Sequence, residues 1–121
     1  MRKCIVILLF CGVCMHGESL ASRSKKLLVA SFAAVTAAEM ADSASSWGKL
    51  ESNPVLGQSR FGVAKAGVKI GLVTGILTGQ YLLLRHHGPA AYKAMAAINF
   101  ASAGVLGGIA YRNTRIAQSL K

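Results

Sequence analysis

Three long apolar stretches, at about residues 27–47, 61–84 and 91–111, constrain this chain more than any other feature. Each covers about 20 to 24 residues, which as a helix crosses the roughly 30 Å hydrocarbon core of a bilayer. An Asn-Pro dipeptide separates the first two stretches and a Gly-Pro dipeptide the last two, and both typically end helices. Apolar residues make up 53% of the chain, and the mean hydropathy is +0.46. The sequence therefore predicts an all-α fold, a small transmembrane three-helix bundle.

The first 21 residues have the pattern of a secretory signal peptide. They begin with Arg2 and Lys3, continue with an apolar core of about 12 residues, and end in a polar segment with small residues at Ser19 and Ala21. An apolar core this short favours a signal over a membrane span. We therefore expect cleavage after Ala21, which leaves a helical membrane domain at 22–121.

All three cysteines, Cys4, Cys11 and Cys14, lie in this short apolar core. Cys11-x-x-Cys14 lacks the strand-helix context of a redox motif. After cleavage the chain has no thiol for a disulfide or a metal. His86 and His87 are adjacent, so on a helix they point in different directions and do not predict a metal site. We expect no metal and no cofactor.

Glycine recurs at every fourth position of the second stretch, at Gly67, Gly71, Gly75 and Gly79. In a water-soluble helix each glycine costs about 1 kcal/mol relative to alanine. In a bilayer, a face made of glycines lets another helix approach closely. The third stretch carries its own small face, formed by Ala94, Ala97, Ala101, Gly104 and Gly108. Two arrangements are open: the glycine face packs against the third helix of the same chain, or it binds a second chain.

Charged residues interrupt the first two stretches. Glu39 and Asp42 lie three residues apart on one helix face, and two lysines, Lys65 and Lys69, lie four apart on the next helix. In an antiparallel pair of helices, Asp42 comes level with Lys65, and Glu39 comes level with Lys69. A lone charge near the bilayer centre costs about 2.5–3.5 kcal/mol on insertion scales, so we predict two intramembrane charge pairs that set the helix register. Asn99, in the third stretch, should find a hydrogen-bond partner across the bundle.

Two short motifs flank the first loop. The first is Asp42-x-x-Ser45, and the second is Glu51-x-Asn53-Pro54, which precedes an apolar helix with an early lysine. Together they resemble a family of small bacterial membrane proteins of unknown function, whose members carry Asp-x-x-Thr and Glu-x-Asn-Pro. Ser45 replaces the usual threonine, and the glycine-rich turn before the glutamate is shortened here. The resemblance implies a compact helical membrane unit and carries no activity with it. The loop motif is expected to have a structural role, in which Glu51 and Asn53 cap the loop or the helix ends.

The orientation follows from the signal peptide. Translocation of the segment after Ala21 places the mature N-terminus outside the cell membrane and the C-terminus in the cytoplasm. Cytoplasmic loops usually carry an excess of lysine and arginine. Here five basic residues flank the helices on each side, so this rule does not determine the orientation. We expect a bacterial cell membrane protein in this orientation.

The charge distribution and the absence of catalytic motifs exclude several classes of function. The formal net charge is +10, but the basic residues occur singly or in short groups between apolar runs, which favours a lipid bilayer over nucleic acid. No nucleophile-base set, phosphate loop or zinc spacing occurs, so we expect no enzyme. The sequence favours a structural unit that assembles through the glycine face, with itself or with a larger membrane complex. The alternatives are a subunit of an ion, proton or small-solute transport pore, and an exported soluble helical bundle.

Overall fold

The computed structural model describes residues 19–49 and 59–119, where every regular element is a helix. The all-α prediction is confirmed, and each of the three helices is long and apolar enough to cross a membrane. The predicted signal peptide falls mostly, and the loop motif at 51–54 entirely, outside the described residues. The helices are α2 (Leu20–Ser46), α3 (Val63–Leu84) and α4 (Pro89–Ser119).

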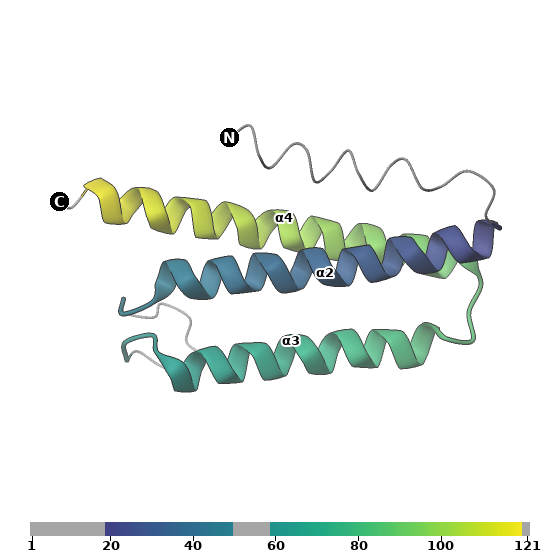
Figure 1. The fold of residues 1–121 in the computed structure, drawn as a ribbon, viewed down its shortest axis with the longest axis horizontal. Coiled ribbons are helices and arrows are strands. Elements are labelled where there is room, and N and C mark those ends of the chain that lie inside the picture. Colours follow the sequence, from purple (N-terminus) through teal and green to yellow (C-terminus); the bar gives the residue numbers. More distant parts are fainter. Residues whose placement is uncertain (1–18, 50–58, 120–121) are drawn as a thin grey trace.

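The closest helix pair is α2 with α4. These two helices run in the same direction along each other, and α3 runs in the opposite direction beside α2 (Figure 1). Small side chains allow the close approach, because Ser24, Ser31 and Ala96 are each at most 1% exposed. The two helices that are separated along the chain therefore form the packed pair, and α3 is the more loosely attached element.

Two helices are longer than the sequence pattern predicts. Helix α2 starts at Leu20, seven residues before the expected start, because Ser19 caps it: the Ser19 Oγ accepts a hydrogen bond from the Ser22 backbone N at 3.3 Å. The expected cleavage point after Ala21 thus lies in the first turn of α2. Helix α4 continues to Ser119, eight residues past the expected end, through a polar segment that apolar periodicity does not reveal.

A short backbone connection closes the joint between α2 and α3. Helix α2 ends at Ser46 with Trp47 as its C-cap, and Gly48 follows with a φ of 75°, a left-handed conformation that favours glycine. The Gly48 N donates to the Phe61 carbonyl at 2.9 Å, and the Phe61 N donates to the Lys49 carbonyl at 2.8 Å. The rings of Trp47 and Phe61 meet edge to face, with centroids 6.2 Å apart. Phe61 is thereby held at the base of α3, where it is 2% exposed.

The surface of α3 is apolar outside the contact with α2. Within the most apolar segment of each helix, 6% of the residues are buried in α3 and 33% in α2. Charged and amide side chains are buried between the helices instead. This distribution is what a helix facing lipid shows, and it disfavours the soluble alternative. The exposed large side chains of α3 include Val63, Val68, Ile70, Leu72, Ile76, Leu82 and Leu83.

Candidate functional site

Three charged side chains meet between α2 and α3, and we call Glu39, Asp42 and Lys69 the charge cluster. The Lys69 Nζ lies 2.5 Å from the Asp42 Oδ2 and 3.4 Å from the Glu39 Oε1. Both carboxylates are buried, with exposed fractions of 7% and 5% for Glu39 and Asp42. One lysine therefore serves two acidic residues that the sequence pattern had assigned to two different lysines.

Lys65 lies nearer the start of α3 than the charge cluster. Its Nζ donates to the backbone carbonyl of Ser59 at 2.6 Å. The predicted pairing of Asp42 with Lys65 is thus replaced by the pair with Lys69. The reason is the joint described above: Phe61 folds back onto the end of α2, which brings Lys65 level with the loop and Lys69 level with both acids.

Helix α4 also contributes to the charge cluster. The Asn113 Nδ2 donates to the Asp42 Oδ1 at 3.4 Å and to the Ser46 Oγ at 3.3 Å. The Asn113 carbonyl accepts a hydrogen bond from the Lys49 Nζ at 2.9 Å. Sequence reasoning missed Asn113 because the residue lies beyond the predicted end of the third helix.

An aromatic ring covers the lysine of the charge cluster. The Lys69 Nζ lies 5.4 Å from the centroid of the Phe61 ring, a distance at which a cation is attracted to the ring face. Because Phe61 is fixed by two backbone hydrogen bonds, the ring shields the charge cluster at the loop end of the bundle.

A second polar layer joins all three helices, and we call Ser31, Gln80 and Asn99 the amide layer. The Asn99 Nδ2 donates to the Gln80 Oε1 at 2.9 Å, and the Gln80 Nε2 donates to the Asn99 Oδ1 at 3.2 Å. The Asn99 Nδ2 also donates to the Ser31 Oγ at 3.1 Å. The predicted partner for Asn99 across the bundle is confirmed. Gln80 was missed, although an amide inside an apolar stretch is a signal of the same kind.

The four glycines of α3, which we call the glycine ridge, face away from α2. Gly67, Gly71, Gly75 and Gly79 leave open space: a Cβ atom added to any of them meets no heavy atom of the described residues within 4 Å. The side chains that bind α2 and α4, those of Lys69 and Gln80, project from other sides of the helix. The glycine ridge is therefore not packed against α4 within the chain. The small residues Gly104 and Gly108 of α4 are equally open.

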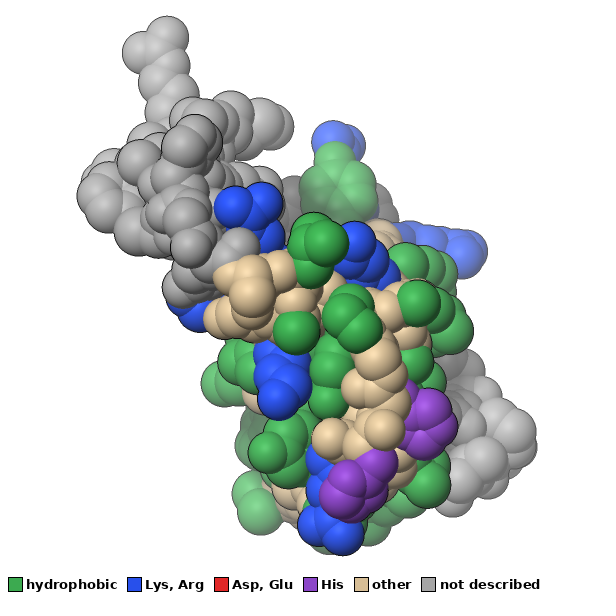
Figure 2. Space-filling model, turned by 90° about the vertical axis from the view of Figure 1, so that its right-hand side faces the viewer, with side chains coloured by type: hydrophobic (Ala, Val, Ile, Leu, Met, Phe, Trp, Pro, Cys, Tyr) green, Lys and Arg blue, Asp and Glu red, His purple; other side chains and the backbone are tan. Residues whose placement is uncertain are grey.

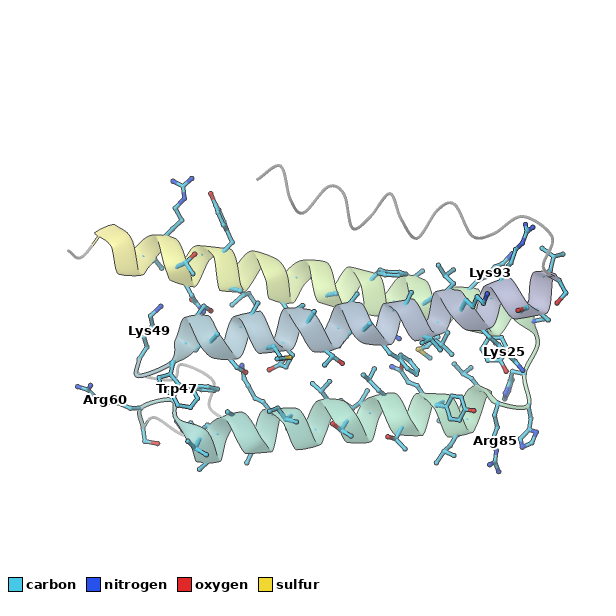
Figure 3. All side chains as sticks on the ribbon, viewed as in Figure 1. Lys25, Trp47, Lys49, Arg60, Arg85 and Lys93 are labelled. Carbon is cyan, nitrogen blue, oxygen red and sulfur yellow. The ribbon has the colours of Figure 1, made fainter. Side chains whose placement is uncertain are left out.

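Basic side chains gather at the end of the bundle where α3 connects to α4. Lys25, Arg85 and Lys93 lie at this end (Figure 3). His86 and His87 are exposed in the connection between α3 and α4. Viewed from this end, the surface shows Lys, Arg and His side chains and no acidic one among the described residues (Figure 2). This composition suits the headgroup region of a bilayer.

No family model, no curated protein and no solved structure matches the sequence. The resemblance to small bacterial membrane proteins stays a prediction. Within residues 19–49 and 59–119, no three His, Cys, Asp or Glu side chains gather as a metal site.

Proposed function

We propose that this chain is a small, non-enzymatic integral membrane protein that assembles through the glycine ridge of α3. The observation that carries the proposal is the open space along the ridge, where Gly67, Gly71, Gly75 and Gly79 have no neighbour within 4 Å in the described part of the chain. Glycine weakens an isolated helix, and its recurrence at every fourth position favours close contact with another helix.

The attachment of α3 supports the same function. Within the chain α3 is bound to its neighbours mainly by the charge cluster and the amide layer, and by Leu84 in a small apolar cluster with Leu28 and Tyr92. Its remaining circumference is exposed. A helix with so little internal packing has most of its van der Waals contact area left for another helix, and such contacts drive association in lipid.

The partner we propose is a second copy of the chain. Two identical ridges can cross each other about a two-fold axis, because the same surface then serves both subunits. Membership in a larger membrane complex is the other outcome of the test. The orientation that goes with this proposal places the end with Ser22 outside the cell membrane and the end with Trp47 at the cytoplasmic face.

Gly71→Leu is expected to weaken self-association by about tenfold or more, because the leucine side chain holds the two backbones apart. The dimer fraction in bilayers, measured by energy transfer between labelled chains at several protein-to-lipid ratios, checks this. Gly104→Leu is the matched comparison, since it places the same side chain in open space on α4. Wild-type chains that stay monomeric, or dimers lost only in Gly104→Leu, would contradict the assignment to α3.

A second candidate function is a subunit of a transport path, which the charge cluster favours. Glu39, Asp42 and Lys69 are ionisable groups inside membrane-length helices, and such groups often line ion or proton pathways. In liposomes, Glu39→Gln is expected to lower any ion or proton flux that the wild-type chain supports. A flux that Glu39→Gln leaves unaltered would rule out this path.

A further inference from the structure

Positive charge is concentrated at the end of the bundle where α3 connects to α4. Each helix brings one exposed cation there, and we call the three residues Lys25 of α2, Arg85 at the end of α3 and Lys93 of α4 the basic end (Figure 3). Arg23 and Lys26 add two more positive charges in the first two turns of α2. Because three helices contribute, this concentration of charge is a property of the folded bundle and not of one segment.

The described residues place no carboxylate beside the basic end. Among residues 19–49 and 59–119 the acidic side chains are those of Glu39 and Asp42, and Lys69 binds both. Glu39 follows Lys25 on α2 by about 20 Å, at the helical rise of about 1.5 Å per residue. Exposed charges more than about 10 Å apart are largely screened from each other in 0.1 M salt. The positive charge of the basic end is therefore available to an anionic partner.

An exposed tyrosine relates the basic end to the depth of a bilayer. Tyr81 is 57% exposed and lies one turn before Arg85 on α3. The Arg85 N donates to the Tyr81 carbonyl at 3.0 Å, so the helical geometry continues to Arg85 and the two side chains share one side of the helix. Exposed tyrosines favour the boundary between hydrocarbon and headgroups. Arg85, one turn further out, is therefore expected at the level of the lipid phosphates.

An anionic phospholipid fits this arrangement better than an acidic protein does. The three cations stand on three different helices, Lys93 on the side of α4 and Arg85 on the side of α3 (Figure 3). Lipid headgroups surround a membrane protein on all sides, whereas a docked protein covers one side. Next to Arg85, the side chains of Leu82 and Leu83 are 50% and 73% exposed. A lipid can place its phosphate at the cation and its acyl chains on these leucines.

We infer that the basic end binds the headgroups of anionic phospholipids through Lys25, Arg85 and Lys93. Lysine and arginine are attracted to an anionic membrane surface, and an arginine side chain can donate two parallel hydrogen bonds to one phosphate. The bound lipids hold this end of the bundle at a fixed depth in the bilayer. The inference rests on the membrane location that we propose, and it does not depend on self-association through the glycine ridge.

The test places the full chain in phosphatidylcholine bilayers that contain a small share of spin-labelled lipid. The labelled lipid is either phosphatidylglycerol, which is anionic, or phosphatidylcholine with the same acyl chains. The immobilised fraction of each gives the ratio of their association constants, and we expect wild type to prefer phosphatidylglycerol. Lys25→Gln, Arg85→Gln and Lys93→Gln should each lower this ratio by up to about fivefold, and the triple variant should remove most of the preference. The exchange of Lys25→Arg, Arg85→Lys and Lys93→Arg keeps the charge and should keep the preference.

The matched control removes three charges from the other end of the bundle. Arg60, Arg112 and Arg115 are exposed, and changing all three to glutamine lowers the net charge by the same amount. Arg115 is already engaged within the chain, since its Nε donates to the Tyr111 hydroxyl at 2.8 Å. The control variant should therefore keep most of the preference for phosphatidylglycerol. Gly71→Leu should also keep it, which separates lipid binding from self-association.

Three results would overturn the inference. The first is an inserted wild-type chain that binds both lipids equally, which leaves the proposed membrane location intact. The second is an equal loss of preference in the two triple variants, which means that net charge alone attracts the lipid. The third is displacement of phosphatidylglycerol by inorganic phosphate or by a soluble acidic peptide at constant ionic strength, which assigns the basic end to that partner. The three single substitutions decide the matter even if the triple variant does not fold.

Discussion

Lys69→Met is expected to destabilise the fold by about 3–5 kcal/mol, the usual cost of removing one partner from a buried ion pair. The substitution leaves the carboxylates of Glu39 and Asp42 without a cation in a place where both are more than nine-tenths buried. It also removes both ion pairs by which Lys69 of α3 is bound to α2. The measurement is the free energy of unfolding by SDS titration, together with an energy-transfer distance between α2 and α3.

The double variant Lys69→Met with Asp42→Asn separates charge from packing. It removes one negative charge as well as the positive one, so it should recover a large part of the lost free energy. Lys93→Met is the matched control, because Lys93 is exposed at the end of the bundle and should change stability little (Figure 3). A Lys69→Met chain as stable as wild type would show that the charge cluster does not attach α3.

Ala96→Leu is expected to destabilise the packed pair of α2 and α4 by about 1–3 kcal/mol. Ala96 is fully buried, and the two helices approach closely because Ser24 and Ser31 are also small and buried. A leucine adds three carbon atoms at a contact that has no room for them, so α4 must move away from α2. The amide layer should weaken as well, since Asn99 is on the same face less than one turn further on.

Ala97→Leu is the control for this prediction. The residue is next to Ala96 in the same helix but is exposed, so the same substitution adds a side chain to the lipid-facing surface. Unfolding by SDS titration should give a free energy close to wild type for Ala97→Leu and a clear loss for Ala96→Leu. Equal effects of the two substitutions would contradict the close α2–α4 contact.

Several features of the site could be predicted from the sequence. The spacing of Glu39 and Asp42 placed both acids on one helix face, and Lys69 was expected to meet one of them. Asn99 was expected to need a partner, since an unsatisfied amide is costly in an apolar environment. These predictions rest on helix periodicity and on the cost of burying polar groups, and both act through residues that lie close along the chain.

Other features of the site could not be predicted from the sequence. Asn113 lies in a polar segment with no apolar periodicity, so the pattern ended the third helix too early, before the residue that contacts Asp42. The choice of Lys69 over Lys65 depends on two backbone hydrogen bonds at Phe61, which shift the level of α3 against α2. Helix periodicity gives the face on which a side chain lies but not the height at which two helices meet.

The sequence by itself determined the class of this protein: three helices of membrane length, with buried charges and a glycine ridge. It did so because apolar length and residue spacing are properties of single segments. The tertiary structure alone decided that α2 packs with α4, that one lysine serves two acids, and that the glycine ridge faces outward. These outcomes depend on which helix faces meet and at what height, and that is set by contacts between residues far apart in the chain.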